Sequence, residues 1–329
     1  MWQTTVMIDR RTTLLSVAAL TVSAIPAMAQ SGPFEAFVTG VKAEARRAGI
    51  RDATLTAAFA GVTPNQHVID LDRRQPDSTM TWSDFRTRFV TPLRRQQARD
   101  AFAKNRALLD RVQARYGVDA HTITGIWGFE SGFGVNRGNY RLVESLSTLA
   151  WEGRRGPYFR KELMNVLRIL DAGDVTPARL TGSYAGAMGQ PQFMPSSYLA
   201  YAVDFEGSGK RDIWDSVPDV LASIANYLQH SGWRTGEPWG QPVRLPAGFN
   251  TRAAGRDNKR PLGEWAREGV TRNDGTPFGR SDVTGGVLLP DGGDPGEAYM
   301  VYSNFNVIRR YNASDFYALV VGLLGDAAA

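Results

Sequence analysis

Glu130 is the residue whose type and setting best suit acid–base chemistry. It follows the run Ile123-Thr-Gly-Ile-Trp127-Gly-Phe and precedes a glycine-rich break. On a helix, Ile123, Trp127 and Glu130 share one face, so the carboxyl group ends an apolar stripe. An apolar setting raises the pKa of a carboxyl group, and a glycosidase general acid needs this to keep its proton near neutral pH. Taken alone, such a stretch is more often a helix end whose glutamate points to water.

The segment 183–198 has the composition of a ligand-binding loop. Its sequence is Ser-Tyr-Ala-Gly-Ala-Met-Gly-Gln-Pro-Gln-Phe-Met-Pro-Ser-Ser-Tyr. Gly186 and Gly189 allow the backbone to approach a ligand closely, and Gln190 and Gln192 carry donors and acceptors for sugar hydroxyl and N-acetyl groups. A buried Gly/Ala turn is the alternative, but so many small and amide residues together favour binding. Flat apolar faces for pyranose rings come from Tyr184, Phe193 and Tyr198.

The segment 204–215 is similar to the calcium loop of an EF-hand. Acids or hydroxyls stand at loop positions 1, 3, 5, 9 and 12, with glycine at position 6. A serine at position 5, an aspartate at position 12 and an internal Lys-Arg pair all weaken a calcium site, so weak structural binding and a metal-free loop both stay open. The predicted ligands are Asp204, Glu206, Ser208, the backbone carbonyl of Lys210, and Asp215.

Tyr311 and Tyr317 flank the start of the last predicted helix, where they can contact a sugar or a catalytic carboxylate. Core packing with satisfied hydroxyls is the commoner role of such residues. Other chemistries lack their signatures, because the three histidines have no metal-ligand spacing and no nucleophile elbow, P-loop or dinucleotide fingerprint occurs.

The elements that must position these residues are mostly helices. Apolar spacing and capping residues predict a helical region over 40–113 and helices over 119–131, 158–170, 218–230 and 314–324, with caps at Asp119, Ser216 and Ser314. The segment 236–300 is dense in glycine and proline and has short apolar runs, which predicts a small β-rich lobe. The fold class is therefore mainly α with a minor β lobe.

The first residues have the pattern of an export signal. Arg10-Arg11 precedes a short apolar stretch and an Ala-Met-Ala site, so we expect cleavage after Ala29 by a general or twin-arginine route. The absence of cysteine removes disulfides and a lipid-acceptor residue, so no membrane anchor is expected. The net charge of +5 suits an anionic polymer such as cell wall, but it fits nucleic acid or a membrane surface equally well, so charge alone does not decide the partner. No nucleic-acid motif is present, so nucleic acid is not an expected partner.

Six ordered motifs together resemble the lytic murein transglycosylase B family. The resemblance runs from about Phe34 to Leu324, nearly the whole mature chain. The motifs are Gly128-Phe-Glu-Ser-Gly-Phe-Gly134, Ser183-Tyr-Ala-Gly-Ala-Met-Gly189, Gln192-Phe-Met-Pro-Ser-Ser197, Asn226-Tyr-Leu228, Gly232-Trp233, and Asn304-Phe with Arg310-Tyr-Asn312.

The resemblance implies a lysozyme-like core, an N-terminal α-helical domain and a small β-rich domain. The expected limits are a signal peptide over 1–29, an α-helical domain over 30–118, a catalytic core over 119–235, a β-rich domain over 236–300, and a C-terminal helix over 301–329 that completes the core. A soluble periplasmic monomer that acts on peptidoglycan glycan strands is expected, with no required cofactor.

The resemblance also implies residue roles, with Glu130 as the single catalytic acid. Arg154 and Arg155 match paired basic residues near the peptide stem, and Phe85 stands where relatives can have a groove tyrosine. The residues of the sugar groove and its loop are Ser183, Tyr184, Met188, Gln192, Phe193, Tyr227, Tyr311, Asn312 and Tyr317.

The implied reaction is cleavage of the β-1,4 bond between N-acetylmuramic acid and N-acetylglucosamine, with formation of a 1,6-anhydro ring. Three alternatives remain. A hydrolytic muramidase could use the same fold. A non-catalytic peptidoglycan-binding protein would not need the intact Glu130 motif. A calcium-responsive interaction protein would rest on one unpaired loop.

Overall fold

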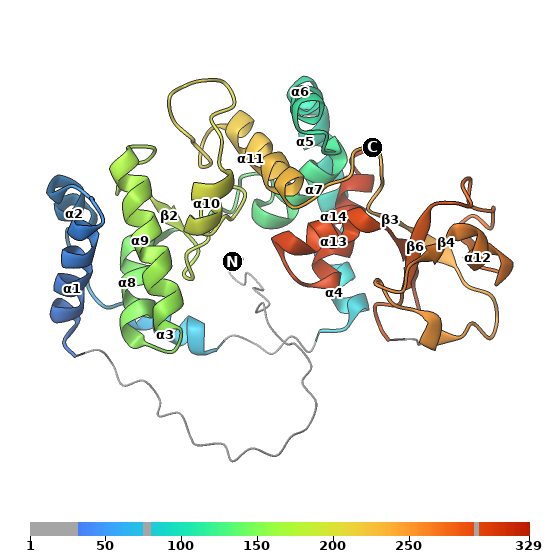
Figure 1. Cartoon of the computed structure of the whole chain (residues 1–329), viewed down its shortest axis with the longest axis horizontal. Helices are drawn as coiled ribbons and strands as arrows, with labels where there is room; N and C mark the ends of the chain where they lie inside the picture. Colours follow the sequence, from blue (N-terminus) through green and yellow to red (C-terminus); the bar gives the residue numbers. More distant parts are fainter. Residues whose placement is uncertain (1–31, 75–79, 293–295) are drawn as a thin grey trace, which may run out of the picture. The chain divides into compact units, whose positions relative to one another are not determined.

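The computed structural model describes residues 32–74, 80–292 and 296–329, so the predicted signal segment lies outside the described residues. The chain folds into two compact units, drawn in Figure 1. Of the described residues, one unit takes 32–74 and 130–224, and the other takes 80–129, 225–292 and 296–329. The boundary between them falls inside helices α7 (Ala120–Ser131) and α11 (Val217–His230).

The first unit is built on the antiparallel pair α8 (Leu142–Glu152) and α9 (Gly156–Ala172), which lie side by side in Figure 1. The apolar face predicted for 158–170 is buried, since Phe159, Leu163 and Val166 are at most 1% exposed. Around this pair pack α1 (Phe34–Arg47), α2 (Asp52–Ala58), α3 (Gln66–Arg73) and α10 (Pro195–Tyr201). Short strands β1 (Tyr140–Arg141) and β2 (Thr181–Gly182) pair antiparallel.

The helices of the second unit include a close crossing between α7 and α14 (Asp315–Asp326). A Cβ atom on Gly125 would lie 2.2 Å from the carbonyl oxygen of Val321, and one on Gly325 would lie 2.7 Å from that of His121. The two backbones therefore pack against each other directly at glycine. The unit also contains α4 (Trp82–Phe89), α5 (Pro92–Lys104), α6 (Arg106–Tyr116) and α13 (Ser303–Tyr311).

The segment predicted to be β-rich forms a five-stranded antiparallel sheet in the order β4-β6-β7-β3-β5. Its core surrounds Trp265, which is fully buried and donates its indole hydrogen to the carbonyl oxygen of Gly285. Helix α12 (Leu262–Arg267) and a short 3-10 turn, Thr251–Ala253, complete the lobe. The strands are β3 (Gly240–Arg244), β4 (Arg260–Pro261), β5 (Thr271–Arg272), β6 (Thr284–Leu288) and β7 (Ala298–Val301).

Three helix starts predicted from capping residues are present. The side chains of Asp119, Ser216 and Ser314 accept hydrogen bonds from the backbone N–H three residues on, at 2.9, 3.3 and 3.3 Å. The mainly helical fold class with a small β lobe is confirmed. Within the described part of the chain, no helix combines the length and apolar character needed to cross a membrane.

Candidate active site

Glu130 is the penultimate residue of α7 and is half-buried. Ile123 and Trp127, which precede it on the same helix face, are 0% and 4% exposed, so the predicted apolar stripe is real. The helix ends immediately after the glutamate, because Gly132, Phe133 and Gly134 all have positive φ angles. Phe133 is strained in this conformation, because a left-handed φ angle brings the Cβ atom of a non-glycine residue too close to the backbone.

The loop 132–139 that follows Glu130 packs closely against the segment 182–190, at the backbone of Gly182 and at the side chain of Gln190. A Cβ atom on Gly138 would lie 2.1 Å from the backbone carbon of Gly182, and one on Gly134 would lie 2.5 Å from Oε1 of Gln190. Neither contact leaves room for a larger residue. The glycines after Glu130 therefore allow its loop to pack closely on the predicted binding loop.

The loop 183–194 is largely built into the core of the first unit. Met188 and Phe193 are 0% and 2% exposed and exchange two backbone hydrogen bonds, of 2.8 and 3.1 Å. The hydroxyl of Ser183 accepts the N–H of Ala187. These three predicted groove residues shape the loop from inside, whereas Tyr184 stays half-buried with its ring edge-on to Tyr140.

Gln192 has an unusual backbone and a constrained side chain. Its φ angle is +49°, and it is one of two non-glycine residues with positive φ in the described ranges 32–74, 80–292 and 296–329. Its Nε2 atom donates to the carbonyl oxygens of Gly189, at 2.7 Å, and Arg137, at 3.2 Å. Such strain persists only where the surroundings enforce it, and it is concentrated at ligand and active sites. The side chain holds two loops together besides any role towards a sugar.

Arg154 and Arg155 are oriented by an acid that sequence reasoning missed. Asp72 of α3 is 2% exposed, accepts from Nε of Arg154 at 2.8 Å, and is also paired with the guanidinium of Arg155. Arg155 in addition lies over the ring of Phe159. A signal existed in the sequence, because Asp72 follows Val68 and Ile69 on the buried face of an amphipathic helix, where an unpaired acid is costly.

In the second unit the predicted tyrosines form one cluster. The ring of Tyr311 lies 4.7 Å from that of Tyr227 and 6.4 Å from that of Tyr317. The hydroxyl of Tyr227 donates to the carbonyl oxygen of Arg310, and Asn312 accepts from the N–H of Ser314. Tyr227 and Tyr317 are buried, whereas Tyr311 and Asn312 are half-buried and so are the members that can contact a ligand.

The same unit holds an aromatic core beneath this cluster. Phe129, the residue before Glu130, packs edge-on against Tyr317 and also contacts Phe85 and Phe89. Phe85 is 4% exposed. Phe85 is thus a core residue of this unit, whatever side chain relatives carry there.

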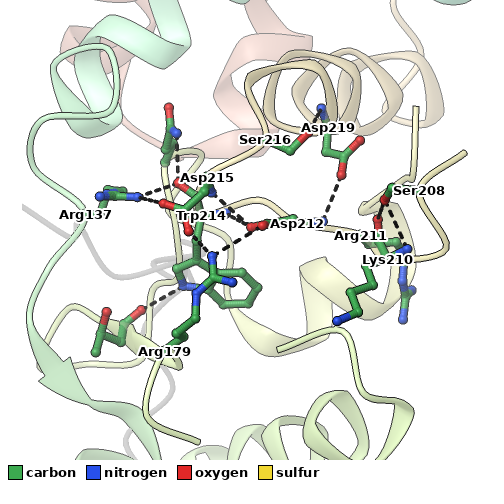
Figure 2. A network of polar contacts seen from close by, with 12 residues as sticks. Arg137, Arg179, Ser208, Lys210, Arg211, Asp212, Trp214, Asp215, Ser216 and Asp219 are labelled. Atoms are coloured by element: carbon green, nitrogen blue, oxygen red, sulfur yellow. Dashed lines mark hydrogen bonds and ion pairs between the residues drawn. The ribbon is translucent and has the colours of Figure 1, made fainter. Parts of the chain in front are cut away.

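The residues predicted as calcium ligands do not fit a metal site. Asp215 is held by Arg137 and Arg179, and Figure 2 shows it turned towards them and away from Ser208 and Lys210. Both carboxylate oxygens of Asp204 accept backbone N–H groups of its own loop, from Ser208 and Gly209. No group of three or more histidine, cysteine, aspartate or glutamate residues within 32–74, 80–292 and 296–329 is arranged to hold a metal ion.

The loop is instead closed by Asp219, the third residue of α11. Its carboxylate is 1% exposed and accepts the N–H groups of Phe205 and Asp212, both at 2.9 Å, so it ties the two ends of the loop together. Burial raises the pKa of Asp219.

Comparison with known proteins identifies the family. The model of the transglycosylase SLT domain matches residues 33–326. The chain belongs to this family. The membrane-bound lytic murein transglycosylase B of Escherichia coli K12 is 37% identical over 257 residues, which cover 75% of this chain and 67% of that protein.

Two solved structures illustrate the similarity within the transglycosylase family. SltB3 from Pseudomonas aeruginosa, in complex with NAG-anhNAM-pentapeptide, is 45% identical with a TM-score of 0.86, covering 90% of this chain and 80% of that one. The Escherichia coli lytic transglycosylase Slt35, in complex with calcium, is 31% identical with a TM-score of 0.74, covering 90% and 92%. The family recognised from the six sequence motifs is confirmed.

Proposed function

We propose that this transglycosylase cleaves the β-1,4 bond between N-acetylmuramic acid and N-acetylglucosamine in peptidoglycan and leaves a 1,6-anhydro-N-acetylmuramic end. The observation that carries the proposal is Glu130, which ends the apolar face of α7 within the matched family domain. A relative at 45% identity has been solved with an anhydro-muramic ligand, the kind of product that this reaction forms.

In this mechanism Glu130 acts twice. It first protonates the glycosidic oxygen as the bond to C1 breaks, while the substrate's own N-acetyl oxygen stabilises C1, as in substrate-assisted glycosidases. Glu130, now a carboxylate, then takes the proton of the muramic C6 hydroxyl, whose oxygen attacks C1 and closes the ring. One carboxyl group is enough, because the acid of the first step is the base of the second.

Those predicted groove residues that are accessible bind and orient the glycan, and the buried ones shape the loop. Tyr311 and Asn312 are the half-buried members of the tyrosine cluster, and we assign them to the sugar groove, with the buried rings of Tyr227 and Tyr317 packed against Tyr311. The side chains of Arg154 and Arg155 are 42% and 30% exposed, and each ends in a guanidinium group. Their chemistry suits the carboxylates of a peptide stem.

We further propose a periplasmic enzyme, because its substrate is cell wall and its first residues have an export pattern. The mature chain then begins at Gln30, carries the domains over 30–118, 119–235, 236–300 and 301–329, and acts as a monomer. N-terminal sequencing of the protein from a periplasmic extract tests export, and an intact Met1 in the membrane fraction contradicts it. The reaction uses no organic cofactor, and no step of it passes through calcium.

The decisive experiment replaces Glu130 with glutamine and analyses the digest of purified sacculi by mass spectrometry. General acid–base catalysis is worth about 10²- to 10⁴-fold, and we expect a loss at or beyond the top of that range because one group serves both steps. The wild-type product should be lighter by one water than a hydrolytic product. Glu35→Gln, at an exposed position of α1, is the matched control and should keep full activity.

Two outcomes contradict the proposal in different ways. Reducing muramic ends as the main product would identify a hydrolytic muramidase that uses the same acid. Full activity of Glu130→Gln would remove both catalytic assignments.

A further inference from the structure

Arg137 joins the loop after Glu130 to the segment 211–216. Its Nη1 atom donates to the carbonyl oxygen of Trp214 and to Oδ1 of Asp215, both at 2.6 Å. The other carboxylate oxygen of Asp215 pairs with the guanidinium of Arg179, which also lies 3.5 Å from Oδ2 of Asp212. Figure 2 shows Arg137 and Arg179 approaching Asp215 from different sides. We call Arg137, Asp215 and Arg179 the arginine brace.

The carboxylate at the centre of the brace is itself held in position. Oδ1 of Asp212 accepts the N–H groups of Trp214 and Asp215, both at 2.9 Å, which fixes the turn that carries Asp215. The indole N–H of Trp214 donates to the carbonyl oxygen of Thr181, and its ring packs on Tyr198. The brace therefore anchors the loop after Glu130 to a rigid part of the first unit.

The brace also reaches the binding loop 183–194. The carbonyl oxygen of Trp214 that accepts from Arg137 accepts from Nε2 of Gln190 as well, at 2.9 Å. The backbone carbonyl of Arg137 accepts from Nε2 of the strained residue Gln192. Arg137 thus stands where three segments meet, and replacing its side chain removes the contacts to Trp214 and Asp215 while the backbone contact to Gln192 remains.

The brace occupies the position that the sequence assigned to a metal ligand. Asp215 is the twelfth residue of the EF-hand-like pattern, but its charge is matched by two arginines rather than left for a cation. Asp204 and Asp219 are satisfied by backbone N–H groups of the loop itself. The charge and hydrogen-bonding needs of this region are met by the chain's own groups.

We propose that Arg137 is a positioning residue that, through Asp215 and Arg179, holds the loop after Glu130 in its active geometry, and that these ion pairs do so without a metal ion. The inference rests on the proposed function, because it assigns the brace to the placement of Glu130. The paired side chains are 39%, 51% and 55% exposed. Surface pairs of this kind add little to global stability, so the brace acts locally.

The first test compares Arg137→Ala with Arg46→Ala, which removes another exposed pair of the same unit, Arg46 with Asp52. A misplacement of about 1 Å can cost 10²-fold in rate, so we expect kcat of Arg137→Ala to fall roughly 10- to 100-fold with a smaller change in KM. Arg137→Lys should restore part of this loss, because one nitrogen atom makes both contacts and an ammonium group can replace it. The control should keep wild-type kinetics.

A second readout does not depend on activity. Amide hydrogen exchange of the peptide 132–139 should be faster by roughly tenfold in Arg137→Ala, and also in Asp215→Ala, with no added effect in the double variant. High NaCl should speed exchange of this peptide in the wild type, because salt screens exposed pairs. Millimolar CaCl₂ and excess EDTA should leave both its exchange and the melting temperature unchanged.

The outcomes separate this inference from the proposed function. If sacculi give no anhydro product but the exchange results hold, the function fails and the metal-free brace stands without its catalytic role. Wild-type kcat in Arg137→Ala, or a loss in KM alone, overturns the positioning role. Slower exchange or a higher melting temperature with calcium overturns the metal-free brace.

Discussion

In the loop 183–194 the glycines touch neighbouring atoms, whereas in the loop 204–215 they face open space. A Cβ atom on Gly189 would lie 2.5 Å from the carbonyl oxygen of Ile213, and one on Gly186 would lie 2.7 Å from Cδ2 of Leu146. Gly207 and Gly209 have no such neighbour within 4 Å, although their φ angles are also positive. The first loop is shaped by close packing, whereas the second is held by polar contacts of Asp204 and of side chains outside it, such as Asp219 and Arg137.

The carboxylates that hold the two loops differ in the same way. Glu162 of α9 is 2% exposed and accepts the N–H and the hydroxyl of Ser196, at the start of α10, where the first loop ends. Asp215, at the end of the second loop, has a side chain that is 51% exposed and pairs with surface arginines. Buried contacts resist substitution strongly, and exposed ion pairs are weak and depend on salt. The first loop is therefore held mainly by buried contacts, whereas the second combines a buried part at Ile213 and Trp214 with an exposed part that polar contacts hold.

The largest difference should appear when each loop receives one alanine. Gly189→Ala adds a steric clash to the cost of left-handed φ, so the free energy of unfolding should fall by about 2–5 kcal/mol. Gly209→Ala has the same backbone cost but open space, and it should lose only about 1–2 kcal/mol. Urea unfolding of both variants measures this. Equal losses would mean that packing does not distinguish the loops.

A smaller difference is expected for the two carboxylates. Glu162→Ala removes a buried acceptor and leaves the two half-buried donors of Ser196 without it, at a cost of about 1–3 kcal/mol in the free energy of unfolding. Asp215→Ala should cost less than about 1 kcal/mol, because its partners remain solvated. Thermal unfolding of the pair tests this order. A larger loss in Asp215→Ala would show that the arginine brace belongs to the global core.

The smallest effect concerns one hydrogen bond between α10, which follows the first loop, and the second loop. Tyr198 of α10 is fully buried and donates its hydroxyl to the carbonyl oxygen of Arg211 in the second loop, at 2.7 Å. Burial raises the pKa of Tyr198, so the hydroxyl stays a neutral donor across ordinary pH. Tyr198→Phe should cost about 0.5–1.5 kcal/mol. An unchanged urea midpoint would mean that this hydrogen bond does not contribute to stability.

Much of the fold could be predicted from neighbouring residues. The caps at Asp119 and Ser314 and the buried face of α9 depend on residues within one or two helical turns, so local rules found them. The β-rich lobe was also expected, but its strand order was not, since pairing joins segments such as β3 and β7 that lie far apart in the chain.

The candidate site was predicted less completely. Glu130, Gln192 and the tyrosines came from ordered motifs, but Asp72, Arg137 and Asp219 carried no motif of their own. Met188 and Phe193 are residue types that suit a sugar groove, but both are buried in the structure. Residue type alone cannot tell a ligand contact from a core contact, because both favour aromatic and small residues.

The sequence by itself determined several of the helices, three of their caps, the family and the position of the acid Glu130, because each of these is written in residues close together or in a fixed order. Only the tertiary structure decided what holds the site. Arg137 and Asp215 are 78 positions apart, and Arg154 and Asp72 are 82 apart. An arginine and an aspartate occur in countless such combinations along a chain. The attraction between two charges falls off with separation, so such a pair stabilises the site only when folding brings the two side chains into contact.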